Sequence, residues 1–463
     1  MTRAAHAVER LAKRLCELVG ESHVFLPTAF YLADETETRG LRGQADLVVT
    51  PGEAGEVAAV VAACYRSGTP IVPRGGGTGF AGGAVPLDGG VVLSLERLNR
   101  VLSFEPALWR MRVEAGVRTS DVRRLARENG LLFPPDPGAA ESSQIGGNIA
   151  TNAGGPHAFK YGVTGAWVTG IEAVVPPGDL VSVGGPVRKD VAGYDLKSLL
   201  IGSEGTLGII TSAWLRLMPA PEVALPVVGV YADAGAGVGA IEAVLGNGLP
   251  VATLEYLDGR VMTAARAGFP GSLPEGTGFA VIAEADGSAS EASSLAGEVQ
   301  QVLQDGALTV HAPAATPEIA RLWRWRDGVS HAVTAQRGGK VSEDVVVPVD
   351  RFREALQGIE AIGSRNELES CSWGHAGDGN LHATFLIDRS DEAALARAAS
   401  AANELFALAA SLGGSISGEH GVGVVKRGQL ARQWPTRALE LHEGIKRVFD
   451  PENLLNPGKK VPR

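Results

Sequence analysis

The sequence predicts an α+β protein of two domains, and three observations support this prediction. In the first half, short apolar strands alternate with glycine-rich segments, and few helices intervene. Residues 218–222 hold two prolines and mark a change of pattern. Beyond them, strands such as residues 251–257 and 278–284 are separated by longer helical patterns, which is typical of an antiparallel sheet with helices on one face.

The first half begins with an amphipathic helix over residues 4–19, ended by Gly20. Apolar runs bounded by turn residues predict strands at 47–49, 71–73, 91–95, 111–114, 168–175 and 207–217. A helix is expected over residues 53–67, with Gly68 as its end, and Thr119 or Ser120 caps another that ends at residues 129–130. In the second half, helices are expected over residues 290–303, 317–333, 351–362 and 393–412.

The composition of the 463 residues is that of a globular protein, with 45% apolar and 20% charged residues. The net charge of -10 argues against a nucleic-acid-binding protein. The three cysteines lack metal or disulfide spacing, so this chain cannot hold an iron–sulfur cluster by itself, and a reduced, cytoplasmic setting is the simplest inference. No apolar run reaches membrane-spanning length, and peripheral attachment to the inner membrane through a partner stays open.

The densest glycine segment is RGGGTGFAGGAVP, residues 74–86, which follows a predicted strand. Glycine lets a ligand approach the backbone closely. The five glycines from Gly75 to Gly82, in a loop without a lysine, indicate that backbone amides bind an anion such as phosphate. A nested G-x-G-x-x-G at Gly77, Gly79 and Gly82 resembles a nicotinamide-binding fingerprint. That fingerprint must open a crossover helix, and Pro86 with the following Gly-Gly pair rules out such a helix.

Two further glycine-rich segments follow, at residues 138–165 and 193–208. Each alone could be a turn. Three such segments in one domain suggest a long ligand laid across several backbone surfaces, as an extended dinucleotide would be.

Histidines mark a second candidate site. His375 and His382 flank a glycine-rich turn, and Ser417–Gly423 adds Glu419 and His420, again between glycines. Two imidazoles and a carboxylate predict a Zn²⁺ or Mn²⁺ site at His375, His382 and Glu419. The alternative is that these histidines bond turns or contact substrate without metal. His420 is the candidate general base, because an imidazole titrates near neutral pH, and its alternative role is a contact with the cofactor.

Arg326 and Lys340 are candidate contacts for a substrate carboxylate. Arg326 shares one face of a predicted helix with Trp323 and Ser330, and an arginine can grip a carboxylate through two parallel hydrogen bonds. A solvated surface position explains either residue equally well on spacing alone.

The glycine segments resemble the FAD-binding motifs of the vanillyl-alcohol oxidase and p-cresol methylhydroxylase superfamily. The matching motifs are PRGGGTGFAGG, IGGNIATNAGG, KYGVTG and GSEGTLGII. The resemblance implies a two-part FAD-binding domain at residues 45–220 after an N-terminal helical segment at 1–44. It also implies a substrate domain, or cap, at 221–450 and a C-terminal return at 451–463.

The same resemblance implies the residues that bind FAD. They are Arg74, Gly75, Gly76, Gly77, Thr78, Gly79, Gly146, Gly147, Asn148, Asn152, Gly205, Ile210 and Asn456. Covalent members of the superfamily attach the flavin through a histidine or cysteine. Because only His157 lies near these segments, non-covalent FAD is expected.

The motifs GHAGDGNLH, GEHGVG and FDPENLLNPGK narrow the resemblance to the D-2-hydroxy-acid dehydrogenase branch. It implies metal binding at His375, His382 and Glu419, catalysis by His420, and carboxylate contacts from Arg326, with Lys340 carried over less securely. The implied reaction oxidises a small D-2-hydroxy acid, of the glycolate or D-lactate type, to the 2-oxo acid with hydride transfer to FAD.

The implied partners are the substrate and an electron acceptor, such as an iron–sulfur or electron-transfer protein. A homodimer, a role as the flavin subunit of a glycolate oxidase complex, and D-2-hydroxyglutarate as substrate stay open. Ether-lipid synthases and sugar-lactone oxidases of the same superfamily are not expected to need the paired-histidine loop together with Glu419 and His420.

Overall fold

The computed structural model describes residues 3–461, which form two compact units. Unit 1 comprises residues up to Gly154, Val163–Ala220 and the segment from Glu419 onward. Unit 2 comprises Gly155–Gly162 and Pro221–Gly418. The predicted substrate domain, residues 221–450, therefore extends beyond unit 2, because the chain after Gly418 packs with the FAD-binding segments of unit 1.

The first part of unit 1 is a four-stranded sheet with the strand order β1-β2-β4-β3. Helices α1 (Arg3–Val19) and α3 (Ala54–Ser67) pack against each other beside it. The strands are β1 (Val24–Phe25), β2 (Leu47–Val49), β3 (Ile71–Arg74) and β4 (Val91–Ser94). Strands β3 and β4 are parallel neighbours, and no helix lies between them in residues 75–90. The prediction that excluded a nicotinamide-type crossover is confirmed.

The second part of unit 1 is an antiparallel sheet with the order β5-β6-β10-β8-β9. Its strands are β5 (Val101–Glu105), β6 (Arg110–Glu114), β8 (Val168–Val175), β9 (Asp179–Gly184) and β10 (Ile209–Arg216). Helix α4 (Thr119–Arg127) follows β6, and α7 (Leu196–Leu200) precedes β10. Helix α5 (Ile145–Thr151) was not predicted, because two of its residues are glycines, which are poor helix formers. It ends at Asn152, whose φ of 54 is left-handed.

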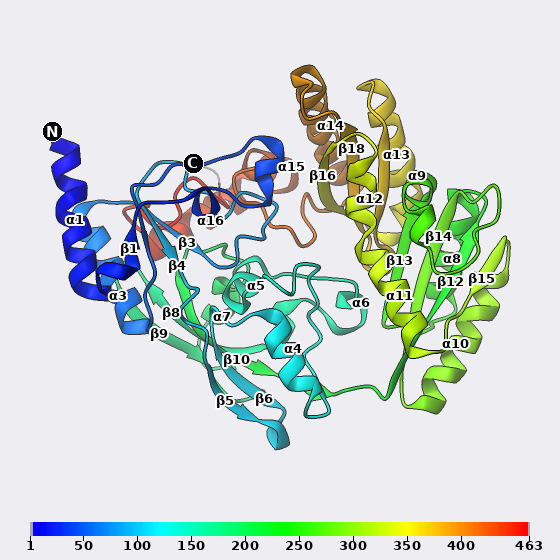
Figure 1. Cartoon of the computed structure of the whole chain (residues 1–463), viewed down its shortest axis with the longest axis horizontal. Helices are drawn as coiled ribbons and strands as arrows, with labels where there is room; N and C mark the ends of the chain where they lie inside the picture. Colours follow the sequence, from blue (N-terminus) through cyan, green and yellow to red (C-terminus); the bar gives the residue numbers. More distant parts are fainter. Residues whose placement is uncertain (1–2, 462–463) are drawn as a thin grey trace. The chain divides into compact units, whose positions relative to one another are not determined.

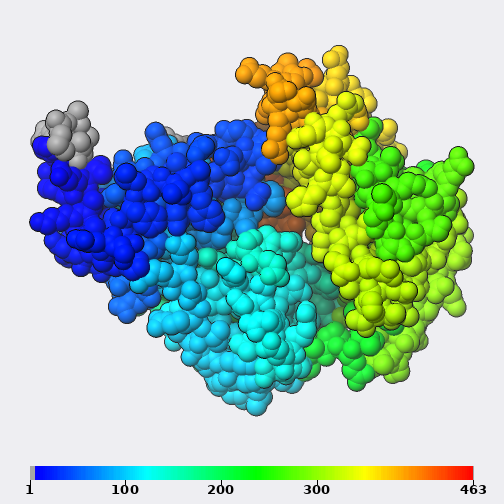
Figure 2. All heavy atoms as spheres, in the orientation of Figure 1, coloured from blue at the N-terminus to red at the C-terminus, as the bar shows by residue number. Residues whose placement is uncertain are grey.

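The C-terminal segment completes unit 1. It contains α15 (Leu430–Gln433) and α16 (Thr436–Phe449). The Asn456 N–H donates to the carbonyl oxygen of Ile71 at 2.7 Å, which fastens this segment to β3. In the space-filling view, the blue to cyan part of the chain makes most of the visible face of unit 1, and little of the C-terminal segment is seen (Figure 2).

Unit 2 is built on a seven-stranded antiparallel sheet with the order β15-β12-β14-β13-β17-β18-β16 (Figure 1). The strands are β12 (Val223–Tyr231), β13 (Thr253–Asp258), β14 (Phe279–Gly287), β15 (Thr309–His311), β16 (Gly339–Val346), β17 (Ser370–His375) and β18 (Asn380–Ile387). One layer of helices covers the sheet; it consists of α8 (Ala234–Gly246), α10 (Ala289–Gln304), α13 (Phe352–Arg365) and α14 (Glu392–Ser411).

A second layer of helices corrects the prediction that helices lie on one face only. Helices α9 (Gly259–Ala264), α11 (Thr316–Asp327) and α12 (Val329–Ala335) pack on the other face, where they bury residues such as Leu257, Ile282 and Trp325. The strands therefore carry apolar side chains toward both faces. The single helix expected over residues 317–333 is divided at Gly328 into α11 and α12.

Candidate functional site

The parts of the three glycine-rich segments that belong to unit 1 lie against one another. A β-carbon placed on Gly76 would lie 2.2 Å from the carbonyl oxygen of Ser142, in the second segment. A β-carbon on Gly205, in the third, would lie 2.5 Å from the Pro73 ring, at the start of the first. Only glycine permits this approach, so the segments form one continuous backbone surface.

This surface fits a polar ligand such as the pyrophosphate and flavin of FAD. Among the described residues, the buried atoms Gln144 Oε1, Ser203 Oγ and Arg74 Nε have no hydrogen-bond partner within the protein. Such atoms are rare in folded proteins unless a ligand or water pairs with them. All three belong to or adjoin the glycine segments.

The predicted FAD residues lie on these segments or beside them, and three asparagines among them make hydrogen bonds that hold the segments in place. Asn148 Nδ2 donates to Thr119 Oγ1 at 2.6 Å, and Asn152 Oδ1 accepts from the Gly165 N–H at 2.8 Å. Asn456 Nδ2 donates to the carbonyl oxygen of Glu204 at 2.8 Å. The remaining predicted residues stand directly on the segments or beside them: Gly75, Gly77, Thr78, Gly79, Gly146, Gly147, Gly205 and Ile210.

The side chain of Arg74 makes contacts within the protein in addition to any contact with a phosphate. Its side chain is buried, it donates to the carbonyl oxygen of Ala33 at 2.7 Å, and its guanidinium lies over the Phe30 ring at 4.7 Å. These contacts fasten the start of the glycine loop to the N-terminal segment.

His420 lies on a loop of unit 1 that packs on the first glycine segment. Its ring stacks on Phe80, with 4.7 Å between centroids. The Val424 N–H donates to the carbonyl oxygen of Ala81 at 2.9 Å, and a β-carbon on Gly423 would lie 1.9 Å from the same oxygen. The structure thus brings the predicted general base and the predicted cofactor loop together within one unit.

In unit 2, the side chains alternate between the two faces of the sheet along each strand, and several polar ones lie together on one part of one face. Residues directly opposite in antiparallel strands point to the same side. The pairs Asp344–His382, His382–Trp373 and His375–Glu255 therefore share one face, which is the face that α9, α11 and α12 cover only in part. The other part of that face is polar, and both predicted metal-ligand histidines lie on it.

His375 and His382 are close neighbours there. Their ring centroids are 5.3 Å apart, and each offers a ring nitrogen within 4.8 Å of the other's. Both side chains are buried. Two imidazoles at this spacing fit a single divalent ion.

Glu255, on β13, fixes the orientation of His375. Its side chain is fully buried, and its Oε1 lies 2.5 Å from His375 Nδ1. With Nδ1–H donated to a carboxylate, Nε2 is left to bind a metal, which is the usual arrangement around metal-ligating histidines. Burial raises the pKa of Glu255, but the charges of Arg326 and His375 outweigh it and lower that pKa to about 2. Sequence reasoning missed Glu255, because it stands inside an ordinary apolar strand.

Arg326, on α11, is bound to the same carboxylate. Its Nε donates to Glu255 Oε2 at 2.7 Å, and a second guanidinium nitrogen donates to the same oxygen. Lys340, on β16, donates to the carbonyl oxygen of Ser330 at 3.0 Å and lies 5.1 Å from the centre of the Trp373 ring. Burial lowers the pKa of Lys340 to about 8. The alternative that Arg326 and Lys340 are solvated surface residues is therefore wrong.

Glu419 is the first residue of the segment that returns to unit 1, one peptide bond after Gly418. Gly418 itself is fixed in unit 2, where its N–H donates to Asp344 Oδ2 at 2.6 Å. A β-carbon on Gly418 would lie 2.4 Å from Asn380 Nδ2, on the strand that carries His382. Asp344 was also missed by sequence reasoning. The close approach of Asn380, rather than the bond to Asp344, explains why glycine precedes Glu419.

The segment Gly155–Gly162, which contains part of the KYGVTG motif, belongs to unit 2. His157 Nε2 lies 2.8 Å from Glu284 Oε1, and Lys160 and Tyr161 both donate to Asp286. His157, the one histidine considered for covalent flavin attachment, is thus paired with a buried carboxylate.

Comparison with known proteins identifies the family. The family described as FAD linked oxidases, C-terminal domain, matches residues 220–460, and an FAD binding domain matches residues 45–184. The chain is 35% identical to "Glycolate oxidase subunit GlcD" of Bacillus subtilis over 89% of this chain and 88% of that protein. It is 35% identical to "D-lactate dehydrogenase" of Anaerostipes hadrus, covering 90% of each, and 37% identical to "D-2-hydroxyglutarate dehydrogenase" of Xanthomonas citri, covering 89% and 88%.

A solved structure of p-cresol methylhydroxylase with substrate bound has the same fold, with a TM-score of 0.79, 18% identity, and coverage of 99% of this chain and 97% of that one. The chain therefore belongs to the FAD-linked oxidases and is an FAD-dependent oxidoreductase with the predicted α+β fold. Within the described residues, no helix is both long enough and apolar enough to cross a membrane.

Proposed function

We propose that this protein oxidises a small D-2-hydroxy acid, of the glycolate or D-lactate type, to the 2-oxo acid with non-covalent FAD. The observation that carries the proposal is the buried pair His375 and His382, with Glu255 holding His375 Nδ1 at 2.5 Å. The names of the relatives, which include glycolate oxidase and D-lactate dehydrogenase, support the substrate class.

His375, His382 and Glu419 would hold a Zn²⁺ or Mn²⁺ ion. The donor set suits these ions, since two neutral imidazoles and a carboxylate leave positions open for the hydroxyl and carboxylate of the substrate. When bound, such an ion would make the hydroxyl more acidic. Glu419 follows directly on Gly418, which is held beside Asn380 on the strand of His382.

His420 accepts the hydroxyl proton in this proposal. Its ring is stacked on Phe80, so its plane is fixed, and the loop beneath it is bonded to Ala81. FAD, when bound to the glycine segments, would supply the acceptor for the hydride from C2 of the substrate. Arg326 and Lys340 would contact the carboxylate of the substrate, although the charge of Arg326 is also shared with Glu255.

The relatives named as a glycolate oxidase subunit favour the possibility that this protein works as one subunit of a complex. As the flavin subunit of a complex, it would pass electrons to an iron–sulfur or electron-transfer partner. D-2-hydroxyglutarate remains the alternative substrate, in keeping with the name of the Xanthomonas relative.

The test is anaerobic reduction of the flavin. The purified holoenzyme, supplied with Zn²⁺ or Mn²⁺, is mixed with glycolate, D-lactate or D-2-hydroxyglutarate, and L-lactate serves as the matched control. The proposal expects the flavin absorbance to bleach with a D-acid or glycolate and to stay unchanged with L-lactate. If no hydroxy acid bleaches it, the proposal is wrong.

A further inference from the structure

Glu204 is an unusual residue inside the third glycine segment. Its φ is 53, in the left-handed region that residues other than glycine rarely adopt, and its side chain is only 3% exposed. A buried carboxylate in a disfavoured backbone conformation persists only when its surroundings hold it there. The contacts of Glu204 therefore indicate what it does.

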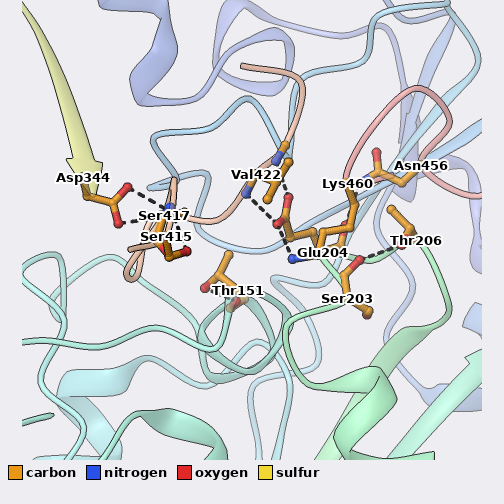
Figure 3. A network of polar contacts seen from close by, with 12 residues as sticks. Thr151, Ser203, Glu204, Thr206, Asp344, Ser415, Ser417, Val422, Asn456 and Lys460 are labelled. Carbon is orange, nitrogen blue, oxygen red and sulfur yellow. Dashed lines mark hydrogen bonds and ion pairs between the residues drawn. The ribbon is translucent and has the colours of Figure 1, made fainter. Parts of the chain in front are cut away.

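The carboxylate of Glu204 binds the backbone of the loop that follows His420. Its Oε1 accepts the Val422 N–H at 2.8 Å, and its Oε2 accepts the Gly423 N–H at 2.6 Å (Figure 3). Lys460 Nζ lies 3.1 Å from Oε1, and the Lys460 N–H donates to the carbonyl oxygen of Gly423 at 3.0 Å. Each carboxylate oxygen thus holds one of two successive amides.

The two glycines on either side of Val422 make this contact possible. Gly421 and Gly423 have φ values of 82 and 49, which turn the two amides toward the carboxylate. A β-carbon on Gly421 would lie 2.9 Å from Glu204 Oε1. Glu204 therefore explains why glycine stands at position 421 of the GEHGVG motif, whereas Ala81 explains Gly423.

The backbone of Glu204 is fastened to other cofactor segments. Its N–H donates to the carbonyl oxygen of Ala150 in α5 at 2.7 Å, and its carbonyl oxygen accepts from Asn456 Nδ2 at 2.8 Å. One residue consequently connects the second glycine segment, the C-terminal motif and the His420 loop, all within unit 1.

We propose that Glu204 is a positioning residue that sets the orientation of His420 by holding the amides of Val422 and Gly423. His420 is separated from the held amides by Gly421 alone, so loss of either bond frees the turn that carries the imidazole. This inference rests on the proposed role of His420 as the proton acceptor.

The test compares Glu204→Gln with Glu114→Gln as the matched control. In Glu204→Gln the new side-chain amide keeps the shape of the original carboxylate but faces a backbone N–H with its own NH₂ group, so one acceptor is lost. Glu114 is also a buried carboxylate of unit 1 that accepts a backbone amide, the Arg100 N–H at 2.7 Å, and pairs with a cation, yet none of these contacts involves the His420 loop.

For Glu204→Gln we expect FAD to remain bound, by its absorption spectrum, and hydrogen exchange at the Val422 and Gly423 amides to accelerate. The rate of flavin reduction at saturating substrate should fall about 10- to 100-fold with little change in KM, because misplacement of the base affects the chemical step. Glu114→Gln should leave the exchange at these two amides and the rate unchanged.

Wild-type exchange at Val422 and Gly423 together with a wild-type rate in Glu204→Gln would overturn the inference. If this variant does not retain FAD, Gly421→Ala decides the question, since its β-carbon displaces the carboxylate without removing it; a wild-type rate there would also overturn the inference. If the wild-type enzyme is reduced by no hydroxy acid, the proposed function fails, and the exchange measurement alone then decides whether Glu204 holds the loop.

Discussion

Two buried glutamates hold two histidines in this protein, and they do so by different means. Glu255 binds side chains: His375 Nδ1 on a neighbouring strand and the guanidinium of Arg326 on a helix. Glu204 binds backbone amides in the loop next to His420. The orientation of His375, on a strand, therefore depends on the side chains that face it. The orientation of His420, on a loop, depends on the backbone conformation of the neighbouring glycines.

The largest effect is expected when a strand-borne ligand is removed. His382→Ala should retain FAD but lose bound Zn²⁺ or Mn²⁺, with metal affinity reduced by more than the roughly 10- to 100-fold typical of residues behind the ligands. Substrate-dependent flavin reduction should be lost with the metal. Metal content is measured by elemental analysis after dialysis, with His331→Ala, an exposed histidine of α12, as the control. Full turnover of His382→Ala would exclude a metal role for this residue.

Removing the carboxylate behind His375 should have the next largest effect. In Glu255→Gln, His375 loses its charged partner and Arg326 is left without a counter-charge in a buried position. We expect metal affinity to fall about 10- to 100-fold and stability to fall by about 3–5 kcal/mol. Titration calorimetry and urea denaturation measure the two effects.

Glu284→Gln is the matched control for metal affinity. Glu284 is a buried carboxylate on the adjacent strand, and it binds His157 and Trp323 instead of a predicted ligand. Equal metal loss in both variants would show that Glu255 has no particular part in orienting His375.

The position of His420, on its loop, should change when a neighbouring glycine is substituted. Gly423→Ala places a β-carbon 1.9 Å from the carbonyl oxygen of Ala81, so the loop must move and His420 with it. We expect flavin reduction to slow about 10- to 100-fold, and metal affinity to fall less than in His382→Ala, because His375 and His382 stay in place and only Glu419 moves with the loop. Gly413→Ala is the control for backbone strain without a clash. Gly413 has a φ of 75, but no atom lies within 4 Å of its β-carbon position. If Gly423→Ala lost metal as completely as His382→Ala, the metal site on the strands would depend on the loop of His420.

The same contrast explains what the sequence could and could not predict. Glycine-rich segments and closely spaced histidines are local patterns, so the cofactor loops, the paired histidines and the absence of a crossover helix could be predicted. Glu255 and Asp344 stand in strands whose partners are 120 and 74 residues away, and only strand register brings them to His375 and Gly418. Arg326 was predicted on its helix, but its binding to Glu255 could not be, because spacing does not identify the partner of a charge.

The smallest expected effect concerns Lys340, a further charged group on the strand-borne polar face. Burial lowers its pKa to about 8 from 10.5, so between these values the unfolded chain binds a proton that the folded chain has released. Stability then rises with pH across this window, because the unfolded state binds more protons. Lys340→Met lacks this dependence, so the wild type should gain about 1 kcal/mol relative to the variant between about pH 8 and about pH 9. Urea denaturation at the two pH values gives the difference directly, and the titration of other groups cancels between the two proteins. Parallel stability curves would mean that Lys340 keeps its ordinary pKa. Its ammonium group would then be hydrated in the folded protein.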